Sequence, residues 1–140
     1  MQPHFAELTE AEAARLDKQR GLVATTLRNR YGAVLTRTKL DLPLIQRLLD
    51  DDVFAPSQTF ELQSLGVAFG DVLATEAGLH WMMVTDDYGT DPTLVRGASS
   101  LQVNALTMIS KRIERAEMVD VAILFARAAE DARNITAAGR

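Results

Sequence analysis

Three basic residues in the C-terminal third of the chain have the types and spacing that suit binding of a phosphate or an acidic partner. Lys111 and Arg115 are four residues apart and share one face of a predicted helix, and Arg112 lies beside Arg115. Glu114 and Glu117 are close enough in sequence to pair with them, so the same residues also fit an ordinary solvated surface. The solvated surface is the simpler interpretation, and the binding site is kept as a hypothesis.

An acidic turn precedes these basic residues. Asp86, Asp87 and Asp91 lie in one predicted loop with Gly89, which suggests oxygen ligands for a divalent cation. A calcium loop of the EF-hand type needs carboxylates at alternating positions, then glycine, then a distal glutamate, and that order is missing here. Aspartate and glycine are common in turns because they form local hydrogen bonds and adopt left-handed conformations. We therefore interpret this segment as a turn without a metal ion.

Few other residues suit catalysis or ligation. His4 and His80 are the only histidines, and neither has a second histidine at ligand spacing. The chain has no cysteine, and its serines lack the glycine elbow or the spaced lysine of known nucleophiles. Trp81 is expected to anchor the core. We expect no catalytic residue, no cofactor and no metal. The candidate ligand- or partner-binding residues are Lys111, Arg112, Arg115, Asp86, Asp87 and Trp81.

Two glycines stand four residues apart in a predicted helix. Gly66 and Gly70 therefore share one face, which could admit a ligand or a partner helix. The alternative is that they let another backbone of the same domain come close, and we expect this packing role because glycine weakens a helix without such a reason. The spacing does not match a dinucleotide-binding fingerprint.

Length and composition indicate one folded domain over residues 1–140. Apolar residues make up 47% of the 140 residues, and the formal net charge is -4. An acidic chain repels nucleic acid and anionic membranes, and it suits a partner with a basic face. The N-terminus has acidic residues and no long apolar run, so we expect neither a signal peptide nor a membrane span. We expect a cytoplasmic protein.

The N-terminal part, residues 1–56, is predicted to be helical. Thr9 can cap a first helix that ends at Gly32, and Gly21 within it suggests a kink or a close contact. Asp41 can cap a second, short helix. A third helix is predicted to begin at Ser57 and to end at Gly78.

After the third helix the apolar period changes. Residues 79–85 are predicted to form a strand, 86–92 a polar connection, and 93–96 and 99–104 two further strands. A helix follows from Ala105, and a last helix begins near Asp120. Strands confined to one block between helices predict an α+β fold, in which a small antiparallel sheet of about three strands packs against helices.

One block of the sequence resembles a family of uncharacterised bacterial proteins known as a domain of unknown function. The resemblance rests on LGVAFGDVL at 65–73, on GLHW at 78–81, on DDYGTDP at 86–92 and on TMISKRIER at 107–115. It covers the C-terminal half closely, so residues 57–135 are expected to form the family-like part. The resemblance implies a bacterial origin and an α+β fold, and it implies no activity, cofactor or catalytic residue.

Two functions remain open from the sequence. The first is a non-enzymatic protein-binding or accessory module of the immunity-protein kind, with another protein as partner and a homodimer as a further possibility. The second is a small-molecule or phosphate-binding domain, with or without catalysis, that uses Lys111, Arg112 and Arg115 opposite Asp86 and Asp87. Convergence of these residues beside Trp81 would favour the second function, and an exposed apolar patch elsewhere would favour the first.

Overall fold

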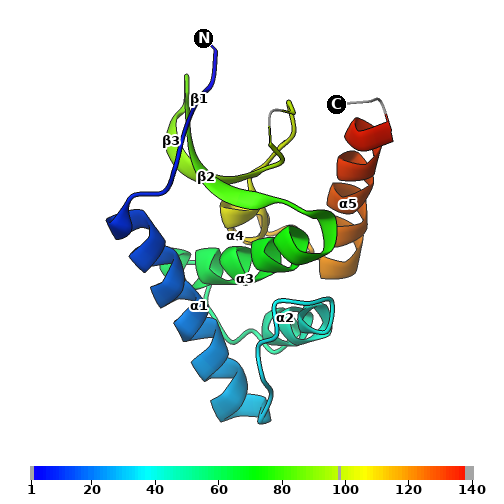
Figure 1. The fold of residues 1–140 in the computed structure, drawn as a ribbon. Coiled ribbons are helices and arrows are strands. Elements are labelled where there is room, and N and C mark those ends of the chain that lie inside the picture. The colour runs from blue at the N-terminus through cyan, green and yellow to red at the C-terminus, as the bar shows by residue number, and fades with distance from the viewer. Residues whose placement is uncertain (1, 98, 138–140) are drawn as a thin grey trace.

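The computed structural model describes residues 2–97 and 99–137. The chain begins with strand β1 (His4–Ala6), which is followed by helices α1 (Glu10–Tyr31), α2 (Asp41–Asp50) and α3 (Thr59–Ala77). Strands β2 (His80–Asp86), β3 (Gly89–Val95) and β4 (Gln102–Val103) come next, and helices α4 (Ala105–Glu114) and α5 (Val121–Ala137) complete the described part. The predicted α+β class is confirmed, with four strands where about three were expected (Figure 1).

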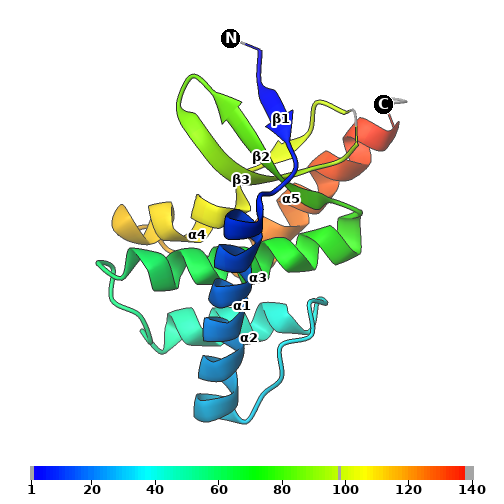
Figure 2. The same cartoon turned by 60° about the vertical axis from the view of Figure 1, so that its left-hand side comes forward.

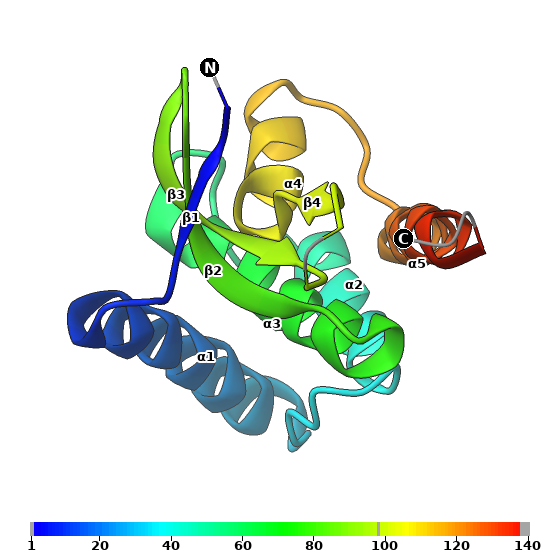
Figure 3. The same ribbon diagram turned by 45° about the horizontal axis from the view of Figure 1, so that its top comes forward.

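The sheet is antiparallel, and its strands follow the order β1-β2-β3-β4. Trp81 of β2 pairs with Leu94 of β3, and Met83 pairs with Pro92. Directly paired residues place their side chains on the same face, so these four side chains form one face of the sheet. That face lies over α3 and α4, while α5 stands beside the sheet (Figures 1 and 3).

The predicted polar connection over 86–92 is wrong in extent. β2 and β3 pair through Asp86 and Gly89, so only Asp87 and Tyr88 form the turn. Pro92 has no N–H to donate, yet it fits here because β4 pairs only with Leu94 and Val95 and leaves this part of β3 at the sheet edge in the described chain.

The other strand predictions also need correction. The expected strand over 99–104 shrinks to the two residues of β4. The three residues of β1 were not predicted as a strand, because a run this short has no periodic signal. β1 is held by pairing with β2, in which Phe5 lies opposite Val84.

Helix α3 lies at the centre of the packing. Its residues 64–73 are all buried, and α1, α2, α4 and α5 all pack against it. Figure 2 shows α4 alongside α3, α2 below it, and α1 crossing it steeply. The main core gathers Leu65, Phe69, Leu94, Ile109 and Val121 from these layers.

The helix ends are set by local capping at three of the predicted positions. The Thr9 hydroxyl accepts a hydrogen bond from the Glu12 amide at 3.1 Å, and Gly32 and Gly78 end α1 and α3 with φ values of 63° and 69°. Helix α3 begins at Thr59, two residues after the predicted start.

Asp41 does not cap the helix that it begins, contrary to the prediction. Its buried carboxylate accepts hydrogen bonds from the amides of Thr36 and Arg37, at 2.8 and 2.7 Å, and from the Thr36 hydroxyl at 2.8 Å. It therefore fixes the preceding loop, in which Arg37 has a φ of 62°.

The two glycines of α3 serve packing within the chain, as expected. A Cβ at Gly66 would lie 2.3 Å from the carbonyl oxygen of Leu106, and one at Gly70 would lie 2.5 Å from the Trp81 ring. Gly66 thus lets the start of α4 approach α3, and Gly70 makes room for Trp81. The close contact, one of the two alternatives expected at Gly21, is not found, because a Cβ there would meet nothing within 4 Å among the described residues.

Tyr31 joins the end of α1 to α2. Its hydroxyl donates to a carboxylate oxygen of Asp51 at 2.6 Å, and the Arg47 guanidinium lies 3.9 Å from its ring centre. Desolvation and the hydrogen bond to Asp51 raise the pKa of Tyr31 above its usual value of about 10.

This pKa shift predicts a loss of stability at alkaline pH. Because the folded state favours the protonated phenol, its contribution is complete below the unfolded pKa of about 10 and is lost as pH rises through the higher pKa of the folded state. We expect Tyr31→Phe to unfold with a smaller fall in free energy of unfolding between pH 9 and pH 11 than the wild type. Urea denaturation at both pH values measures this difference, and parallel pH curves for the two proteins would contradict it.

No helix in the described part of the chain is long and apolar enough to cross a membrane.

Candidate functional site

A buried carboxylate joins α1, α3 and β2. Asp71 of α3 accepts two hydrogen bonds from the Arg20 guanidinium, at 2.6 Å from Nε and 3.0 Å from Nη2, and a third from the Trp81 indole N–H at 3.0 Å. Only 5% of its side chain is exposed, and Arg37 Nε lies 3.9 Å away. The two-pronged contact with Arg20 is the strong geometry for an arginine–carboxylate pair.

Arg20 keeps its positive charge in this network. Burial by itself would lower its pKa, but the hydrogen bonds and charges of Asp71 and Asp17 outweigh that effect and raise the pKa of Arg20 above its usual value. Asp71 therefore meets a permanent cation and an indole donor, so the network is suited to holding three elements together. It also ties Trp81 to the core side of the sheet.

The six residues predicted as candidates do not gather in one place. Asp86 and Lys111 line a small pocket of about 180 Å³, together with Tyr88 of the turn. The Trp81 indole N–H is bonded to Asp71, and Trp81 is not among the residues that line this pocket. The acidic turn and Lys111 are thus neighbours, and Trp81 belongs to the buried network.

The other basic residues point elsewhere. Arg112 donates to the Met108 carbonyl at 2.8 Å and lines a separate pocket of about 270 Å³ with Arg127 and Asp131. Arg115 follows the last turn of α4 and is exposed. Asp87 is exposed within the two-residue turn. The three basic residues therefore do not converge on one concave surface, and no set of three or more acidic or histidine residues in the described chain is placed to hold a metal ion.

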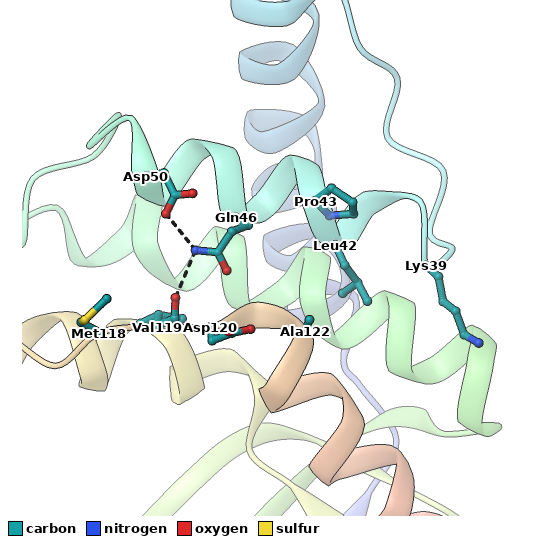
Figure 4. Close-up of a pocket in the computed structure, with 9 residues that line it drawn as sticks. All are labelled: Lys39, Leu42, Pro43, Gln46, Asp50, Met118, Val119, Asp120 and Ala122. Atoms are coloured by element: carbon teal, nitrogen blue, oxygen red, sulfur yellow. Dashed lines mark hydrogen bonds between the residues drawn. The ribbon is translucent and has the colours of Figure 1, made fainter.

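A concave surface lies between α2 and the start of α5. This α2–α5 groove has a volume of about 620 Å³ (Figure 4). Its apolar lining comes from Leu42 and Pro43 of α2, Ala122 of α5, and Met118 and Val119 of the preceding connection. Lys39 lies at one end, and Asp50 and Met118 lie at the other (Figure 4).

One glutamine fixes the two walls of the α2–α5 groove. The Gln46 amide nitrogen donates to the Val119 carbonyl at 3.1 Å and to Asp50 at 2.9 Å, and its oxygen accepts from the Val121 amide at 2.8 Å. The last contact satisfies a free N–H at the start of α5. Because both ends of the amide are engaged, the groove is formed without a ligand.

The side chains around the α2–α5 groove include apolar ones left in solvent. Met118 is 97% exposed, and Leu40 and Ile123, which neighbour the lining residues Lys39 and Ala122 in the chain, are also exposed. The sequence predictions missed Met118, Gln46 and Asp71. A methionine between Glu117 and Asp120 in a polar connection is the one local signal of an apolar surface there.

Comparison with solved structures finds a similar fold in a bacterial protein. A crystal structure from Bacteroides thetaiotaomicron superposes with a TM-score of 0.82 at 16% sequence identity. The match covers 91% of this chain and 47% of the other, so the chain spans about half the length of that protein. At this identity the likeness shows the fold.

Comparison by sequence identifies the family. No functionally curated protein matches the chain significantly. The domain of unknown function DUF3806 matches residues 41–125, which run from the start of α2 into α5 and include α3, the β2–β3 hairpin and both walls of the α2–α5 groove. The chain therefore belongs to the DUF3806 family.

Proposed function

We propose that this protein is a non-enzymatic binding module that holds a segment of another protein in the α2–α5 groove. The observation that carries the proposal is Met118, which is 97% exposed at the mouth of a preformed apolar groove. An exposed apolar side chain beside an apolar hollow is a common mark of a protein-interaction surface. A single phosphate site has less support, because Lys111 and Arg112 line different pockets and the Trp81 indole N–H is bonded to Asp71.

The size and charge of the groove suggest what its partner carries. Helix α2 has 10 residues, so one wall is about 15 Å long, the length of a short helical or extended peptide. Asp50 lies at the Met118 end and is followed by the exposed Asp51 and Asp52. We infer a partner segment with two or three apolar side chains and a lysine or arginine that lies near Asp50.

Selection of peptides from a displayed library of random 16-residue sequences tests this proposal. We expect enriched peptides to combine apolar residues with lysine or arginine, and to bind the wild type with micromolar dissociation constants. Met118→Lys should weaken binding at least tenfold, or about 1.4 kcal/mol, because it removes an apolar side chain and places a positive charge beside the basic residue of the partner.

Tyr88→Lys is the matched control. Tyr88 is as exposed as Met118 and lies in the turn between β2 and β3, so the same new charge falls outside the lining residues of the groove. Its binding should equal that of the wild type. Peptides that bind both variants equally well would contradict the proposal. Loss of self-association in Met118→Lys, without any bound peptide, would assign the groove to a second copy of this chain.

A further inference from the structure

A glutamine in α1 is buried with nothing to bond. Gln19 has no exposed surface, and neither its Nε2 nor its Oε1 has a hydrogen-bond partner within the described residues. Buried amides are almost always paired, since an unpaired donor and acceptor lose their bonds to water without compensation. An apolar residue would fit the core-facing stripe of Leu16, Val23 and Leu27 without this penalty. A hydrogen-bond partner for the Gln19 amide must therefore come from outside the described chain.

Gln19 lines a pocket of about 320 Å³ between α1, β3 and the start of α4. This volume is at the lower end of the range for small-molecule sites. The lining combines polar side chains with apolar ones, of which Leu16, Pro92 and Leu106 are buried and Met83 is half-buried. A ligand would thus bury an apolar stem against these side chains, with one amide nearby to recognise its tip. We call this hollow the Gln19 pocket.

Charges of both signs stand at the mouth of the Gln19 pocket. Arg15 is exposed there, and its guanidinium lies 5.2 Å from the ring centre of Phe60, which helps to hold it in place. Glu12 supplies a carboxylate. Among the described residues neither Glu12 nor Arg15 forms an ion pair, so their charges remain available to a ligand.

We propose that the Gln19 pocket binds a free α-amino acid with an uncharged polar side chain. The ligand carboxylate would meet Arg15, and its ammonium group would meet Glu12. The side chain would then extend over Leu16 and Leu106 and place a carboxamide or hydroxyl within reach of Gln19. This site is separate from the α2–α5 groove, and the proposal does not depend on the function of that groove.

The interior of the Gln19 pocket sets its selectivity. A carboxamide offers one donor edge and one acceptor to its ligand, so a neutral amide or hydroxyl is its natural complement. A side-chain carboxylate would be a buried charge without a cation, and an aliphatic tip would leave Gln19 unpaired. Because the glutamine side chain has several rotatable bonds, a turn about them can bring the sealed amide to the ligand. L-Glutamine should therefore bind better than L-glutamate or L-norleucine, which have similar length.

Isothermal titration with these three amino acids tests the proposal. We expect the wild type to bind L-glutamine with a dissociation constant below about 1 mM, and the other two at least tenfold more weakly. Gln19→Leu should fold with unchanged or higher thermal stability, because it removes an unpaired buried amide, and should lose the preference for L-glutamine over L-norleucine. Arg15→Ala should weaken binding of all three at least tenfold.

Arg28→Ala is the matched control for Arg15→Ala, because Arg28 is an exposed arginine of the same helix outside the pocket. It should bind L-glutamine as the wild type does. The proposal is overturned if the wild type binds none of the three amino acids at 20 mM ligand, a concentration about twenty times the expected limit. It is also overturned if Gln19→Leu keeps the wild-type preference, or if L-glutamate binds as well as L-glutamine.

Discussion

Replacement of Asp71 by alanine is expected to lower the free energy of unfolding by about 3–5 kcal/mol. The change leaves the partly buried guanidinium of Arg20 without its two-pronged partner and the indole N–H of Trp81 without an acceptor. The side-chain hydrogen bonds that join α1 and β2 to α3 through Asp71 are then lost. Urea denaturation followed by far-ultraviolet circular dichroism measures the loss.

Asp17→Asn is the control, because Asp17 contacts the same arginine from a side chain that is 71% exposed. A surface pair of this kind contributes less than about 1 kcal/mol. The double variant Asp71→Leu with Arg20→Met should recover part of the loss, since it removes both buried charges together. A cost below about 1 kcal/mol for Asp71→Ala would show that the network does not hold these elements together.

Gly66→Ala is expected to destabilise the fold by about 1–3 kcal/mol. The new methyl group would lie 2.3 Å from the Leu106 carbonyl oxygen and 2.5 Å from that of Ala105. Both obstacles are backbone atoms at the start of α4, so the whole helix must move, and overpacking of this kind is costly. Thermal unfolding of the purified variant provides the measurement.

The same substitution in α1 should have the opposite sign. Gly21 lies within a helix, and a Cβ there would meet nothing within 4 Å among the described residues. Gly21→Ala should therefore raise the free energy of unfolding by about 0.5–1 kcal/mol, because alanine loses less conformational freedom. If both variants unfold at the same temperature, the close approach of α4 to α3 is not the reason for Gly66.

The helices were predictable because their signals are local. Thr9, Gly32 and Gly78 specify helix ends through bonds or backbone angles within a few residues, and the structure places each end there. The role of Asp41 was harder to predict from the sequence. A carboxylate at the start of a helix can cap it or fix the loop before it, and the path of residues 36–38 decides which contact forms.

The sheet was harder because its pairing is not local. The aspartates, glycine and proline of segment 86–92 have turn chemistry, yet most of them lie in strands, since pairing of β2 with β3 outweighs local preference. Strand β1 depends wholly on contact with a partner some eighty residues away. Its three residues carry no periodic pattern that would reveal it.

The candidate surfaces were the least predictable part. Lys111, Arg112 and Arg115 were predicted as a binding site because of their positive charge. Successive residues of a helix point in different directions, so Lys111 and Arg112 line different pockets. The α2–α5 groove arises where residues about seventy positions apart meet through Gln46. Asp71 is the one acidic residue within the apolar run of α3, and that position could have marked it as a buried carboxylate. Met118 is an apolar residue in a charged connection, and that position could have marked it as an exposed apolar side chain.

The most direct test of the proposed function is amide chemical-shift mapping. The ¹⁵N-labelled protein is titrated with the tightest peptide from the displayed library, and each backbone amide is followed. We predict that the largest shifts lie on α2, at Leu42 and Gln46, and on the segment from Met118 to Ala122, which line the α2–α5 groove. Largest shifts on the hairpin residues 86–91, with the groove amides unchanged, would contradict the proposal.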